Sequence, residues 1–126
     1  MSIRATFQPA VNDFIANLQE FATGSYLKEE EREFWDQPFD PAVLPELRGI
    51  LESYLDALDA LGESPDQDSL NTVAQNTLDA LEKFNERHAG AVVEPEEKEE
   101  ITELMFDSAK LTGADDLALD NFPEFE

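Results

Sequence analysis

SPDQDSLNTVAQNTLDALEKFNERH, residues 64–88, is the stretch that decides the fold. Along it, small and apolar residues recur every three or four positions, the spacing that places side chains on one face of an α-helix. This inward face comprises Leu70, Ala74, Thr77, Leu81, Phe84 and His88, with Val73 and Leu78 beside it. Ser64 with Gln67 three residues later predicts a capping box at its start, and Gly90 predicts its end. The stretch therefore predicts a long amphipathic helix that packs on a core.

Three other segments show the same period, and each of them is followed by a glycine that can end a helix. They predict helices over residues 8–23, 41–61 and 96–111. Asp40 is placed to cap the second of these, because Pro41 after it suits the first helical position. The inward residues are Phe7, Val11, Phe14, Leu18 and Phe21 in the first helix, Leu47, Leu51, Tyr54, Leu58 and Leu61 in the second, and Ile101, Leu104, Met105, Ser108 and Leu111 in the last.

Four amphipathic helices with short connections predict an all-α fold, a four-helix up-down bundle formed by residues 1–113. A short extra helical turn is expected between the first and second helices, ahead of Pro41. Residues 114–126 form an acidic, aromatic C-terminal extension. This extension can add one short helix around Leu117 and can pack on the bundle.

The charge of the chain is strongly negative and unevenly distributed. Thirty acidic and eight basic residues give a net charge of −22. Residues 94–126 hold twelve acids and two bases, whereas residues 1–24 hold two acids and one base. This charge opposes direct binding to nucleic acid or to anionic membranes, and it favours basic partners. A solubilising surface or adaptation to salt would produce similar acidity.

Aromatic residues lie inside acidic segments in two places. Phe34, Trp35 and Phe39 occur in EFWDQPFDP, and Phe122 and Phe125 occur in NFPEFE. Such mixtures suit hydrophobic anchoring on a basic partner. The alternative is local packing, with Trp35 and Phe39 covering one end of the bundle and Phe122 folding back on it. The candidate partner-binding residues are Glu96, Glu97, Glu99, Glu100, Asp115, Asp116, Phe122, Phe125 and Trp35.

Residue types suited to catalysis or metal binding do not occur in the usual patterns. The chain has no cysteine, its glycines are isolated, and its single histidine, His88, follows Asn85 where a di-iron bundle needs glutamate. We expect His88 to contact free carbonyls at the helix end or to cap the core. Residues 66–71 begin like a calcium loop but lack its glycine, so helix capping explains them better. Asp115, Asp116 and Asp120 could loosely gather a divalent cation near the C-terminus, although an acidic tail accumulates such ions without a designed site.

These features predict a non-enzymatic acidic helical protein that binds another macromolecule, a protein with a basic surface. We expect no catalytic residue, no cofactor and no metal ion. One alternative is a mimic of DNA that occupies the basic groove of a nucleic-acid-binding protein. A third reading, an enzyme or metal-binding protein, would require buried carboxylates that converge in a pocket. The absence of cysteine, of a signal-like N-terminus and of a long apolar run predicts a cytoplasmic protein without a membrane role.

Overall fold

The computed structural model describes residues 2–24, 27–32, 39–63, 65–88, 90–119 and 122–123. Across these ranges the chain is helical and contains no strand. The elements are α1 (Ile3–Thr23), α2 (Glu29–Arg32), a 3₁₀ turn η1 (Pro41–Val43), α3 (Leu44–Leu61), α4 (Gln67–Arg87), α5 (Pro95–Lys110) and α6 (Asp116–Leu119). The prediction of an all-α fold with four long helices, a short turn after the first and a short helix near Leu117 is confirmed.

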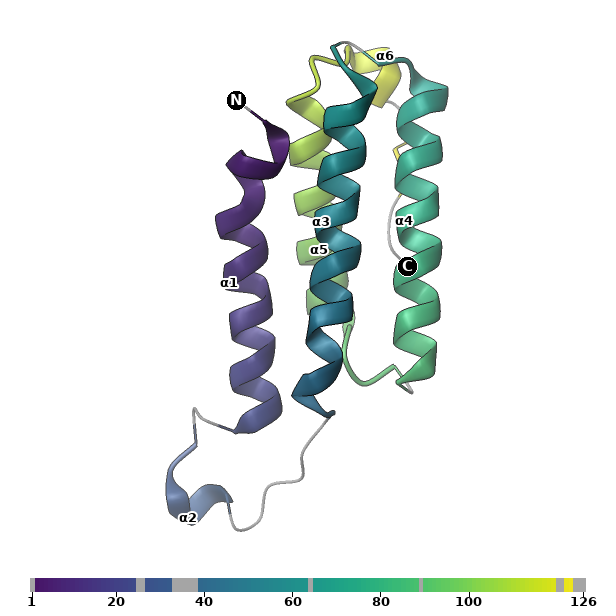
Figure 1. The fold of residues 1–126 in the computed structure, drawn as a ribbon. Helices are drawn as coiled ribbons and strands as arrows, with labels where there is room; N and C mark the ends of the chain where they lie inside the picture. Colours follow the sequence, from purple (N-terminus) through teal and green to yellow (C-terminus); the bar gives the residue numbers. More distant parts are fainter. Residues whose placement is uncertain are drawn as a thin grey trace.

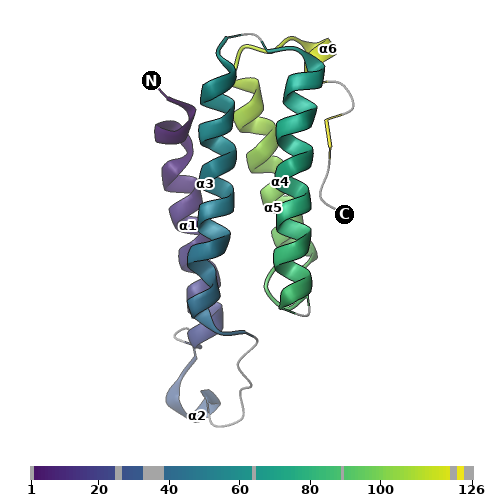
Figure 2. The ribbon, with the colours of Figure 1, turned by 45° about the vertical axis from the view of Figure 1, so that its right-hand side comes forward.

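The four long helices alternate in direction, so the bundle has the up-down topology that the short connections predicted (Figure 1). α3 packs against α1, α4 and α5, and α1 also packs against α5. In the turned view α5 runs behind α3 and α4 (Figure 2). α1 and α5 are therefore antiparallel neighbours, although they are the first and last long helices of the chain.

α1 begins five residues earlier than its period predicted, and its start depends on a contact with α3. The Ser2 hydroxyl accepts a hydrogen bond from the Ala5 amide at 2.9 Å. The amides of Ile3 and Arg4 donate to the Asp59 carboxylate of α3, at 2.8 and 3.1 Å. These acceptors satisfy amides that a helix start leaves free. The turn before Pro9 is therefore stable, with the proline inside the helix.

The start of α4 differs from the predicted capping box. Ser64 lies outside the described residues, and the cap is Asp66, whose Oδ1 accepts a hydrogen bond from the Ser69 amide at 2.8 Å. This backbone hydrogen bond lowers the pKa of the exposed Asp66 carboxyl. A carboxylate is a stronger acceptor than a hydroxyl and is favoured at the positive end of a helix dipole. Asp40 caps the 3₁₀ turn η1, because its Oδ1 accepts from the Ala42 amide at 2.9 Å, whereas α3 itself begins three residues later than predicted and has no side-chain cap.

The predicted inward stripes form one core. Its fully buried large side chains include Leu47, Leu51, Leu55, Leu58, Leu70, Leu81, Phe84, Ile101 and Met105. Tyr54 is buried among them and donates its hydroxyl to the Met105 carbonyl at 2.7 Å. Burial raises the pKa of Tyr54 far above its ordinary value. α3 and α5 are thus joined by a buried hydrogen bond as well as by apolar packing.

Two residues assigned to the inward stripes lie on the surface. Leu111 is 52% exposed and is the C-cap residue that follows Lys110, the last residue of α5. Phe21 is 38% exposed near the end of α1, where its ring lies 6.4 Å from that of Phe39. Phe39 is buried, in agreement with the packing interpretation of that residue. Trp35 lies outside the described residues.

The C-terminal extension returns to the bundle. α6 packs against α4, and Leu119 is partly buried against the core. The Phe122 ring meets the Phe106 ring of α5 edge-on, with 5.7 Å between centroids. Phe122 therefore packs on its own chain, as one of the two interpretations of this residue expected. Phe125 lies outside the described residues.

Candidate interaction surface

The outer face of α5 carries a row of carboxylates. The helix buries Ile101, Met105, Ser108 and Ala109, so the opposite side of the cylinder faces solvent. The exposed acids on it are Glu96, Glu99, Glu100, Glu103 and Asp107, and Glu97 is half-buried. Pro95 starts the helix, and acids in the first turn are stabilised by the helix dipole. The regular geometry of α5 thus fixes the spacing of six carboxylates along the helix.

Few of these carboxylates form ion pairs with other described residues. Within the described ranges, Asp107 is the only α5 acid with an ion pair, at 3.7 Å from Lys110. Other bases pair elsewhere: Arg4 and Arg48 contact acids of α3, and Arg87 contacts Glu46 at 2.9 Å. These three arginines are therefore used between α1, α3 and α4, and the two bases on α5 itself are Lys98 and Lys110.

The electrostatic consequence is visible at Glu97. Partial burial raises the pKa of the Glu97 carboxyl above its ordinary value, and the neighbouring charges of Glu94, Glu100 and Glu96 raise it further. A hydrogen bond from its own backbone amide lowers this pKa, but by less than burial raises it. The start of α5 is thus a place where negative charges repel one another in the folded protein.

The structure separates the predicted partner-binding residues into different places. Glu96, Glu97, Glu99 and Glu100 lie in the first two turns of α5, at one end of the bundle. Asp115 and Asp116 lie at α6, at the opposite end (Figure 1). Phe122 contacts Phe106 and is only partly exposed. The row on α5 is therefore a surface by itself, and the acids of α6 are not continuous with its start.

A groove between α1 and α5 adjoins this row. It has a volume of about 300 Å³ and is lined by Ala10, Asp13, Phe14, Asn17, Glu100, Ile101 and Leu104. Phe14 and Ile101 are buried, Leu104 is half-buried, and Asp13 and Glu100 are exposed. The groove thus combines an apolar floor with one carboxylate from each helix. No pattern in the sequence indicated it, because its two walls come from segments about 90 residues apart.

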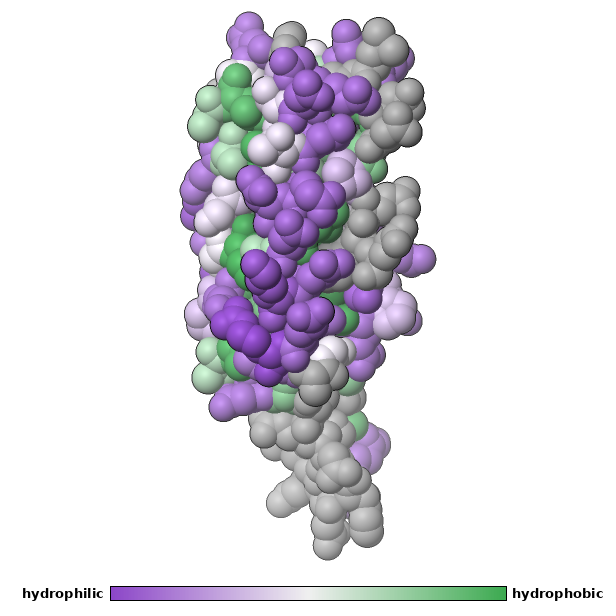
Figure 3. Space-filling view, turned by 90° about the vertical axis from the view of Figure 1, so that its right-hand side faces the viewer, coloured by the Kyte–Doolittle hydropathy of each residue, from purple (hydrophilic) through white to green (hydrophobic). Residues whose placement is uncertain are grey.

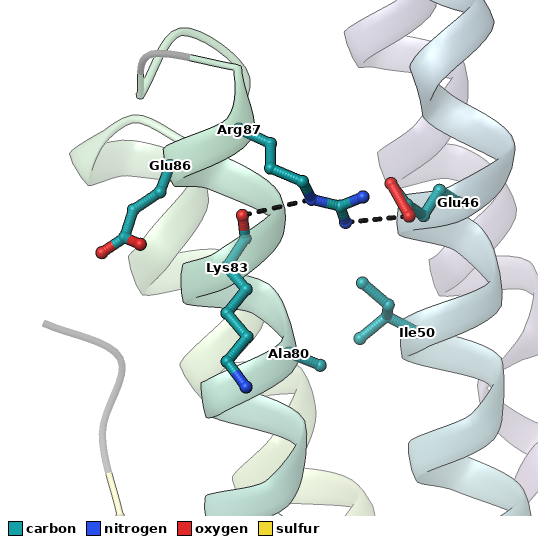
Figure 4. A pocket seen from close by; sticks show the side chains of 6 residues that line it. All are labelled: Glu46, Ile50, Ala80, Lys83, Glu86 and Arg87. Atoms are coloured by element: carbon teal, nitrogen blue, oxygen red, sulfur yellow. Dashed lines mark hydrogen bonds and ion pairs between the residues drawn. The ribbon is translucent and has the colours of Figure 1, made fainter.

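A second groove lies between α3 and α4 and differs in charge. Two adjoining hollows of about 640 and 500 Å³ share Glu46, Ile50 and Ala80. The charged side chains around them are Glu46, Glu86, Lys83 and Arg87, two acids and two bases. Figure 4 shows Arg87 reaching across from α4 to Glu46 of α3, with Ile50 and Ala80 beside the gap. This groove is electrically balanced in a chain of strongly negative charge.

The described residues that the sequence singled out for chemistry are His88 and the acids of residues 66–71 and 115–116. Over the described ranges, the buried polar side chains are Thr77, Ser108 and Thr112, so no carboxylate is buried there. No group of three or more metal-ligating side chains occurs in this part of the chain. His88 packs edge-on against Phe84, with 4.8 Å between ring centroids, which agrees with the expectation that it caps the core. Its Nε2 is buried and has no hydrogen-bond partner in the described parts of the chain.

The face of the bundle seen in Figure 3 is mostly hydrophilic, with separated apolar patches. Among the described residues, no helix is both long enough and apolar enough to cross a bilayer. No protein-family model matches the chain, and neither does any curated protein or any solved structure.

Proposed function

We propose that this chain is a non-enzymatic binding protein for another protein with a basic surface, and that the outer face of α5 is the docking face. The observation that carries the proposal is the row of α5 carboxylates, five of them exposed and only Asp107 in an ion pair within the described ranges. A cytoplasmic location, expected from the composition, remains part of this proposal.

The physical basis is the repulsion at the start of α5. Glu97 has a raised pKa partly because Glu94, Glu96 and Glu100 are close to it. Lysine or arginine side chains of a partner would remove this repulsion, so the free energy of binding would include its relief. The same field would attract a basic partner from a distance and accelerate association, and added salt would screen it.

The proposal is tested with two variants of equal net charge. The α5 quartet variant changes Glu96, Glu97, Glu99 and Glu100 to glutamine. The control quartet variant changes Glu20, Glu30, Glu63 and Glu82, exposed acids on other elements, to glutamine. The probe is a fluorescently labelled helical peptide of lysine and alanine, and its affinity is measured by anisotropy at low and moderate salt.

We expect the α5 quartet variant to bind this peptide about tenfold more weakly than the parent, because each lost pair is worth a few tenths of a kcal/mol or more. The control quartet variant should lose clearly less. Equal losses in both variants would show that only net charge matters, and that α5 is no docking face.

A DNA mimic is a second candidate, and the charge spacing of α5 favours it. Six carboxylates lie between Glu96 and Asp107, a length of about 16 Å at a rise of about 1.5 Å per residue. This is about one carboxylate per 3 Å, with the base Lys98 among them, and it is close to the spacing of about 3.4 Å between charges along one DNA strand. The parent, and not the α5 quartet variant, should then displace labelled duplex DNA from a lysine-rich DNA-binding protein. Displacement by both variants alike would argue against mimicry.

A further inference from the structure

The two grooves described above offer different chemistry to a partner. The groove between α3 and α4 is the larger, and its acids and bases balance. The groove between α1 and α5 has an apolar floor and carries only negative charge at its rim, from Asp13 and Glu100. Neither carboxylate is in an ion pair in the described parts of the chain. The groove between α1 and α5 is therefore the one whose charge selects a particular kind of partner.

We propose that the groove between α1 and α5 binds a basic amphipathic helix, with one apolar side chain on the floor and flanking lysine or arginine side chains against Asp13 and Glu100. This inference rests on the proposed function and deepens it, because Glu100 belongs both to the docking row on α5 and to the groove. It adds the requirement that the partner present an apolar side chain, which a row of carboxylates alone does not impose.

The floor explains why the partner must be amphipathic. Leu104 is half-buried at the groove, beside Phe14 and Ile101. An apolar side chain of the partner placed there would therefore remove apolar surface of both molecules from contact with water. A purely polar cationic segment would gain only the electrostatic part. A helix with cations around one apolar ridge can place the ridge on the apolar floor and its cations against the carboxylates of the rim, as in helix-in-groove recognition.

The apolar requirement is tested with a double-mutant cycle. One partner is the lysine and alanine peptide with a leucine pair four residues apart, and the other is the same peptide with serines at those positions. The parent should bind the leucine peptide about tenfold more tightly, the factor expected for burying most of one leucine. Leu104→Ala should reduce this preference, while circular dichroism confirms that the variant is folded.

A second variant keeps the test valid if Leu104→Ala loosens the bundle. Ala10→Phe fills the groove from an exposed position of α1, and Ala16→Phe adds the same ring at an exposed position outside it. We expect Ala10→Phe to abolish the preference for leucine and Ala16→Phe to keep it. An unchanged preference in both Leu104→Ala and Ala10→Phe would overturn the inference.

The rim is tested on α1, where Asp13 and Glu20 are the two acids and both are exposed. Asp13→Lys places a cation at the groove, whereas Glu20→Lys makes the same change of charge outside it. Asp13→Lys should weaken binding of the leucine peptide severalfold more than Glu20→Lys. Equal effects of the two variants would contradict the proposal that Asp13 contacts the partner at the rim of the groove.

The two proposals fail in distinguishable ways. If the α5 and control quartet variants bind the basic peptide equally, the docking face on α5 is wrong. If the quartets differ but the leucine preference does not respond to the groove variants, the docking face stands and the groove inference is wrong.

Discussion

Replacing Gly49 by alanine should stabilise the protein, although Gly49 lies in the middle of α3. Glycine in a helix interior costs about 0.5–1 kcal/mol relative to alanine, because more backbone freedom is lost on folding. Gly49 has no heavy atom within 4 Å of the place its Cβ would occupy, and its φ is not positive. The groove between α3 and α4 leaves this room. Nothing in the fold therefore offsets the gain.

The expected gain is about 0.5–1 kcal/mol in free energy of unfolding. With an unfolding entropy of about 2.1 cal/mol/K per residue, this corresponds to a rise of about 2–4 °C in Tm. Urea unfolding and thermal melting, both followed by far-ultraviolet circular dichroism, would measure it. The matched control is Gly62→Ala, which has equally open surroundings but a φ of +78°.

Gly62 has a φ of 78° and a ψ of −162°, a backbone region that essentially only glycine adopts, so Gly62→Ala should destabilise the protein by about 1–3 kcal/mol. The same substitution should therefore raise the stability at residue 49 and lower it at residue 62. A lower stability of Gly49→Ala would contradict this expectation, since an unseen contact would then have to occupy the space beside α3.

Three further perturbations test the core and the charge. Leu81→Ala, at a fully buried site, should cost about 2–5 kcal/mol in urea unfolding, and a loss under about 0.5 kcal/mol would contradict its assignment to the core. Glu97→Gln should leave stability nearly unchanged in acid and increase it as pH rises above about 4.3, because a raised folded pKa means that stability is lost as the carboxylate ionises. A gain in stability that occurred only at low pH would contradict this prediction. Raising salt from low to moderate concentration should increase Tm by screening acid repulsion, and a constant Tm in calorimetry would refute dominant self-repulsion.

The sequence by itself determined the helices and their inward faces, because both depend on local properties. A repeat of three and four positions aligns Leu70, Ala74 and Leu81 on one side of α4, whatever surrounds the helix. Gly24 and Gly90 adopt the left-handed conformation at helix ends, which a glycine accepts without steric cost. The up-down order followed from short connections. The row of acids on α5 was also predictable, since it shares the period of the buried face.

Other features were decided only by the tertiary structure. The start of α1 depends on Asp59, more than 50 residues away, so the local pattern around Pro9 placed it too late. The raised pKa of Glu97 depends on burial as well as on its neighbours in the sequence. Hydrophobic burial is not directional, so a stripe specifies which face turns inward and not which helix covers it. The pairing of α1 with α5, which joins Asp13 and Glu100 across an apolar floor, could therefore come only from the packed bundle.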